Sequence, residues 1–127
     1  MGYAVLTTET RRASGAIGAA RLVAFHATDS KLALPATDPT QPIMGVSQPE
    51  VDVLDGQRVD IHKLGEVPVI YGGNVRMGRP LTTDALSRAV EAAPGAGVVH
   101  YTFGVAQVPG VLGDTGSALL CPGLVKG

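Results

Sequence analysis

The chain has 127 residues and a mass of 13.0 kDa, enough for one small core but short for two ordinary domains. Its 10 basic and 11 acidic residues leave a net charge of −1, which argues against nucleic acid as a partner. Its single cysteine, Cys121, excludes an intrachain disulfide and a cysteine-rich zinc cluster. No apolar run approaches the roughly 20 residues of a membrane span. We therefore expect a soluble protein made in the cytoplasm.

Residues 1–20 are polar or small and offer few bulky side chains for a core. A segment of this kind is ordered only when a partner holds it. We therefore expect an extended N-terminal arm that contacts a partner, although a frayed terminus fits the same text. The residues proposed to make these contacts are Thr8, Arg11, Arg12 and Arg21.

Residues 21–127 show short apolar segments separated by turn signals. Asp55-Gly56 is a hairpin turn signal, and Gly72-Gly73 ends the alternating run at 67–71. Residues 99–106 alternate as in a half-buried strand. Turn signals every eight to twelve residues are typical of small barrels. We predict an all-β fold, a small β-barrel or sandwich of short antiparallel strands, as a domain over 21–127.

Residues 82–93 fit two structures. Apolar residues at helical spacing, Thr83 as a cap and Pro94 as a stop favour a short helix near 83–93. The competing interpretation is a hairpin that turns through Asp84 to Ser87.

The chain also contains an internal repeat. Gly45-Val46-Ser47-Gln48 is matched by Gly104-Val105-Ala106-Gln107, and similar text follows each, so that 43–67 is repeated at 102–125. The repeat predicts one hairpin unit used twice. We also expect one set of strand residues to be buried together in a single core: Val59, Ile61, Val67, Val69, Val99, Tyr101, Phe103 and Val105.

The residues that could carry chemistry are scattered. His26, His62 and His100 show no metal-binding spacing, and Cys121 beside Leu120 is better explained as a small buried hydrophobe. No nucleophile motif or phosphate-binding glycine loop is present. We therefore expect no enzyme activity, no cofactor and no metal.

Several motifs resemble those of the small capsid decoration (cement) proteins of tailed bacteriophages and prophages. They are Gly72-Gly73-Asn74, Leu81-Thr82-Thr83-Asp84, Arg88-Ala89-Val90 and Gly104-Val105-Ala106, in this order. The similarity covers about residues 43–125. Two positions depart from the family pattern: Pro80 replaces a usual acidic residue, and Leu86-Ser87 replaces a usual turn glycine.

The resemblance implies a β-barrel with an N-terminal arm that binds the outer capsid surface at capsomer junctions and stabilises the expanded head. The implied partners are the major capsid protein and further copies of this chain, as a trimer more than a dimer, with neither nucleic acid nor membrane. Asp55, Gly56, Gly72, Gly73 and Asp84 would shape the turns. Other possible functions are a head fibre base, a tail-tube-like module and a small ligand-binding barrel.

Overall fold

The computed structural model describes residues 5–127, which form nine strands and no helix. This confirms the predicted all-β class. The strands are β1 (Val5–Ala13), β2 (Leu22–Phe25), β3 (Leu32–Pro35), β4 (Ile43–Ser47), β5 (Arg58–Ile70), β6 (Pro80–Thr83), β7 (Ala89–Glu91), β8 (Val99–Ala106) and β9 (Thr115–Lys126).

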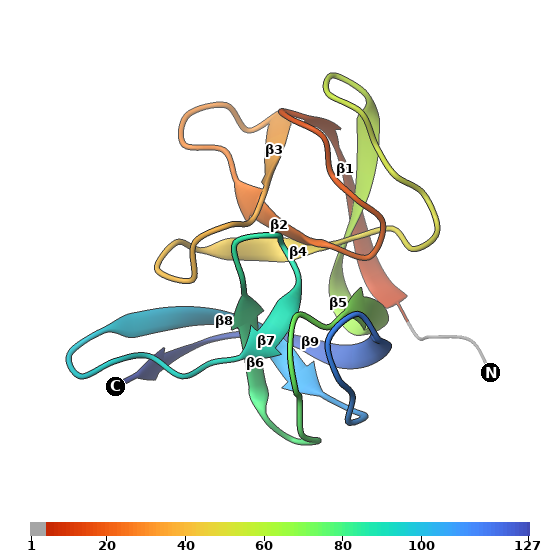
Figure 1. The fold of residues 1–127 in the computed structure, drawn as a ribbon. Coiled ribbons are helices and arrows are strands. Elements are labelled where there is room, and N and C mark those ends of the chain that lie inside the picture. Colours follow the sequence, from red (N-terminus) through yellow and green to blue (C-terminus); the bar gives the residue numbers. More distant parts are fainter. Residues whose placement is uncertain (1–4) are drawn as a thin grey trace.

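The first five strands close into a barrel. Their order is β1-β3-β2-β4-β5, and β1 pairs again with β5 to complete the ring. All of these pairings are antiparallel except that of β1 with β3. This barrel forms the upper part of the molecule in Figure 1. Its interior holds Ala13, Ile17, Val23, Ala33, Met44, Val53, Val59 and Ile61.

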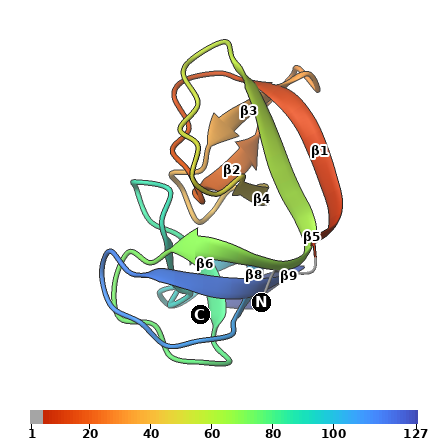
Figure 2. The ribbon, with the colours of Figure 1, turned by 90° about the vertical axis from the view of Figure 1, so that its right-hand side faces the viewer.

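The long strand β5 belongs to two barrels. Its first part pairs with β1 up to Gly65, and residues 65–70 pair with β9. Figure 2 shows the strand bending between the two parts. Gly65 lies at the change of partner with φ +101°, a left-handed conformation that side chains other than glycine disfavour. One strand thereby ends the first barrel and begins the second.

The second ring continues from β5 through β9, β8, β6 and β7. A parallel bridge from Ala89 in β7 to Tyr71, directly after β5, brings the last strand back to the first. The larger core cluster centres on this ring and also includes some residues of the first barrel. Its members are Leu22, Ala36, Ile43, Val46, Val67, Val69, Tyr71, Val75, Leu81, Ala89, Phe103, Ala106, Ala118 and Leu120.

The two barrels repeat one hydrogen-bonding plan. The predicted copies at 43–67 and 102–125 contain the hairpins β4–β5 and β8–β9, and the correspondence extends beyond them. Matched pairs, first barrel before second, are Ala13–Ala33 with Tyr71–Ala89, Ile17–Val53 with Val75–Gly110, and Ser47–Arg21 with Ala106–Arg79. The two barrels therefore share these pairings, and β5 closes the first barrel and opens the second.

The predicted separate arm at 1–20 is wrong for its described part. Strand β1 is a wall of the first barrel, and Ala13, Ile17 and Ala20 are buried. The segment has few bulky side chains, but the interior of a narrow barrel is filled by small ones such as Ala13 and Ala20. Residue 20 therefore does not divide an arm from a domain. Residues 1–4 lie outside the described residues.

Of the two structures that fit residues 82–93, the hairpin is the one that forms, from β6 and β7, and the short helix near 83–93 does not. One oxygen of Asp84 accepts hydrogen bonds from the backbone N–H groups of Leu86 (2.9 Å) and Arg88 (2.8 Å). Ser87 adopts φ +62° at the position where the resembled family has glycine. The Asp84 carboxylate therefore holds the turn of the hairpin interpretation, at Asp84 to Ser87.

The expected single core does not form. A register shift between Thr102 and Gly104 interrupts the alternation of β8, so Phe103 is buried while Tyr101 is half-exposed. Val99 and Val105 are also half-exposed. Val59 and Ile61 pack in the first core, and Val67 and Val69 pack in the second cluster.

Candidate functional site

The histidines do not form a catalytic or metal-binding cluster in residues 5–127. Within this range no group of three or more His, Cys, Asp and Glu side chains is placed to hold a metal ion. His26 accepts backbone hydrogen bonds from its own turn, at Thr28 and Asp29. His62 lies beside Thr8, with 3.2 Å between Thr8 Oγ1 and His62 Nδ1. The pKa of His62 is lowered. The main cause is burial of the ring, and the nearby charge of Asp60 opposes it.

Cys121 is an exposed free thiol on β9, so the expectation that it is buried is wrong. Residues 5–127 contain no helix that is long and apolar enough to cross a membrane.

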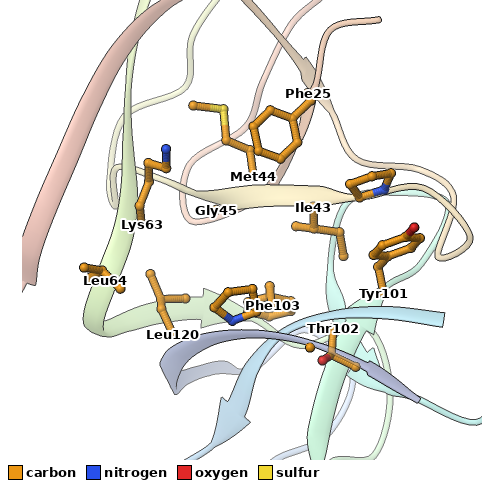
Figure 3. Close-up of a pocket in the computed structure, with 13 residues that line it drawn as sticks. Phe25, Ile43, Met44, Gly45, Lys63, Leu64, Tyr101, Thr102, Phe103 and Leu120 are labelled. Atoms are coloured by element: carbon orange, nitrogen blue, oxygen red, sulfur yellow. The ribbon is translucent and has the colours of Figure 1, made fainter.

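An apolar groove of about 540 Å³ separates the two barrels. Figure 3 shows Phe25, Ile43 and Met44 on one side of it, with Tyr101, Phe103 and Leu120 on the other. The complete lining is Phe25, Pro42, Ile43, Met44, Gly45, Lys63, Leu64, Tyr101, Thr102, Phe103, Leu120, Pro122 and Gly123. Phe25 and Leu64 are 45% and 44% exposed, so apolar surface faces solvent here.

The groove forms where three strands diverge. Pairing of β4 with β5 covers only Val46 and Ser47, and pairing of β5 with β9 runs from Gly65 to Ile70. Between these pairings, Lys63 and Leu64 of β5 face the groove together with the beginning of β4. The groove thus combines apolar side chains with the edges of diverging strands. Such a surface binds an apolar, extended protein segment better than a small polar molecule.

A charged cluster lies beside the groove, in contact with its lining residues Lys63 and Phe25. Glu9 forms ion pairs with Arg11 and with Lys63, the latter at 3.2 Å. The guanidinium of Arg11 lies 5.8 Å from the ring centre of Phe25. The pKa of Glu9 is held below its usual value, mainly by the hydrogen bond from Arg11. The hydrogen bond from Lys63 acts in the same direction, and partial burial opposes both. Lys63, the one charged residue among the described residues that line the groove, is thus paired with Glu9.

The predicted contact residues do not share one site. Thr8 lies beside His62, and Arg11 lies over the ring of Phe25. Arg12 is exposed on the outside of the barrel, where its Nη1 donates to the carbonyl of Gly56 (3.1 Å). Arg21 Nη1 donates to the carbonyl of Leu86 at 3.0 Å, so it joins the first barrel to the β6–β7 turn.

The predicted turn residues occupy turns. Gly56 has φ +82°, and Asp55 accepts the backbone N–H of Gly15 at 2.8 Å. This turn does not join two paired strands, however, because residues 51–54 make only the bridge of Val53 with Ile17.

Gly72 and Gly73 follow β5. A side chain on Gly72 would collide with the Asp84 carboxylate, which pairs with Arg88 at 2.8 Å, whereas Gly73 has open space.

Two cations near Arg12 were missed. Lys31 and Arg58 line the same hollow of about 350 Å³ as Arg12, together with Thr10, Arg11 and Ser30. Arg58 lies directly opposite Arg12 across the pairing of β1 with β5. Only the register of that pairing brings them together, and treating residues 1–20 as a free arm concealed it.

The chain matches no protein-family model and none of the curated proteins. Among solved structures it is similar to the N base of head fibre gp8.5 from bacteriophage phi29. The identity is 24%, the TM-score is 0.69, and the similarity covers 91% of this chain and 93% of that chain. At this identity the similarity establishes a shared fold over nearly the whole length of both chains.

Proposed function

We propose that this protein is a structural component of a phage virion that binds the outer surface of the head. The observation that carries the proposal is the fold shared with a head fibre base over 91% of the chain. The order of the motifs from Gly72 to Ala106 supports it independently, through their resemblance to capsid decoration proteins. The function needs surfaces rather than chemistry, so we propose no enzyme activity and no cofactor.

Binding at capsomer junctions would stabilise the expanded head through contacts with the major capsid protein. A ligand that binds only the assembled shell stabilises it by RT ln(1 + [L]/Kd) per site. Modest affinity repeated over many junctions therefore resists the internal pressure of packaged DNA.

A head fibre base is the second candidate, and the similarity to the gp8.5 N base favours it specifically. A base anchors a projecting structure and need not stabilise the shell. The two functions separate in a heating experiment on purified heads. A decoration protein raises the temperature at which heads release their contents, whereas a base leaves it unchanged.

Self-association is the second part of the proposal, as a trimer more than a dimer. The apolar groove, with exposed Phe25 and Leu64 at its opening, is the surface that we expect a second copy to cover. The net charge of −1 gives little repulsion between copies. A closed ring of copies would bury each groove once and match a three-fold site on a shell.

The test is co-sedimentation of the purified protein with heads assembled without it, together with analytical ultracentrifugation of the protein alone. We expect saturable binding to heads and a sedimentation coefficient above that of a monomer. Protein that fails to bind heads under all salt and pH conditions would refute the proposed function.

Leu64→Glu places a charge in the groove and should shift the protein toward monomer. Leu86→Glu is the matched control, because Leu86 is also exposed, at 61%, and lies outside the groove. Equal sedimentation of both variants and the wild type would separate the groove from self-association.

A further inference from the structure

Three cations form a row across three neighbouring strands on the outside of the first barrel. Arg12 in β1 lies opposite Leu32 of β3 on one side and opposite Arg58 of β5 on the other. Lys31 immediately precedes β3, and its carbonyl accepts the backbone N–H of Arg12 at 2.9 Å. Lys31, Arg12 and Arg58 are all exposed. We name these three residues the cationic row.

The row is electrostatically unfavourable in isolation. Directly opposite residues of an antiparallel pair project from the same face, and like charges there are destabilising. Across the described part of the chain, no member of the row forms an ion pair with a carboxylate. The protein therefore keeps two arginines side by side at a cost to its own stability.

The nearby carboxylates have other hydrogen-bond partners. Asp60 accepts the Thr10 hydroxyl at 2.6 Å, and Asp29 accepts the backbone N–H of Lys31 at 2.8 Å. Glu9 is paired with Arg11 and Lys63. The hollow of about 350 Å³ is also lined by Thr10, whose hydroxyl proton is taken by Asp60, and by Ser30, whose hydroxyl can donate to a bound anion. Its surface thus offers hydrogen-bond donors to an anion.

The second barrel shows that the fold does not require a pair of arginines at the positions of Arg12 and Arg58. In the second barrel the positions matched to Arg12 and Arg58 are Ile70 and Thr115, which pair in the same ladder. The position matched to Lys31 is Ser87. The pairing matched to Arg12–Arg58 therefore forms with two neutral residues, and the charge is particular to the first barrel.

We propose that the cationic row binds an acidic segment of a partner protein, with carboxylate side chains seated between Arg12, Arg58 and Lys31. Arginine presents paired N–H donors that match a carboxylate, and such charge-assisted contacts are strong and directional. A protein partner is favoured over nucleic acid because the cations lie around one hollow, where Arg11 is already paired with Glu9, and do not make a track for a phosphate backbone. The chain is also net negative. That the acidic segment belongs to a protein of the phage head rests on the proposed function.

The test variant carries Arg12→Ile and Arg58→Thr, the residues that the second barrel uses at the matched positions. Its charge-matched control carries Arg79→Gln and Lys126→Gln, two exposed cations outside the row. The probe is a fluorescent hexaglutamate peptide, followed by anisotropy at low and at physiological salt. We expect the test variant to bind roughly tenfold more weakly, with reduced salt dependence, and the control to bind as the wild type does.

A second readout separates binding from structure. The melting temperature of the test variant should stay equal or rise, because a like-charge pair has been removed. Lys31→Gln provides an independent variant outside the β1–β5 pairing and should also weaken peptide binding. Equal affinity of wild type and both row variants for the peptide would overturn the proposal. So would tighter binding of a single-stranded oligonucleotide than of the peptide through the same residues.

Binding to heads distinguishes this proposal from the proposed function. Wild type and test variant that bind heads equally would refute the role of the row in head attachment while the head-binding function stands. Wild type that binds the peptide through the row but binds no heads would refute the head-binding function while the row stands.

Discussion

Among residues 8–127, Tyr71 is the largest fully buried side chain, and its ring should couple energetically to Gly116. The side chain is fully buried, and its hydroxyl donates to the carbonyl of Val108 at 2.6 Å. A methyl group on Gly116 would overlap the tip of the ring, and one on Gly110 would approach it at 2.6 Å. The ring is thus held between two glycine backbones and has little freedom to retreat.

Gly116→Ala should therefore destabilise the protein by about 1 to 3 kcal/mol, the usual cost of overpacking a core. No positive φ is involved at this position, so the cost is steric. In a Tyr71→Leu background the overlapping ring atoms are absent, and the same glycine substitution should cost less than about 0.5 kcal/mol, as for a site without a special contact.

Urea denaturation of the wild type, the two single variants and the double variant gives the coupling energy between the two positions. Burial raises the pKa of Tyr71, so the phenol stays protonated and remains a donor at the pH of the assay. An equal cost of Gly116→Ala in both backgrounds would refute the inference that the ring fills the space beside this glycine.

Three further predictions concern the fold. Deletion of residues 1–13 removes β1 and opens the first barrel, so NMR spectra of the truncated chain should lose their dispersion; a well-dispersed spectrum would restore the separate arm. Phe103→Ala should cost about 3 to 5 kcal/mol in denaturation, since the ring is 3% exposed, and a loss under about 1 kcal/mol would place β8 in another register. Burial lowers the pKa of His62 in the folded protein, so the unfolded chain binds more protons at pH values near that pKa. The contribution of His62 to the free energy of unfolding is therefore complete above its ordinary pKa of 6.5 and is lost as the pH falls below that value. In urea denaturation at several pH values, His62→Gln should reduce the dependence of the free energy of unfolding on pH below 6.5. An unchanged pH dependence would show that other groups cause it.

The sequence alone was sufficient for the fold class and for the duplicated hairpin. Short apolar runs with turn signals have few other solutions than small β rings, and the motif at Gly45 recurs at Gly104 because both units use the same hairpin. The turns at Gly56 and Asp84 were also accessible, since their signals act within a few residues.

Tertiary structure decided which segments close the rings. Whether β1 is an arm or a wall depends on its pairing with β5, some fifty positions away, and local text carries no information about that register. The same pairing places Arg12 opposite Arg58. The hairpin at β6–β7 prevailed over a helix because Ala89 is buried against the second core while Leu86 remains exposed. Pairing and burial across the ring, which are long-range contacts, outweighed local helical spacing.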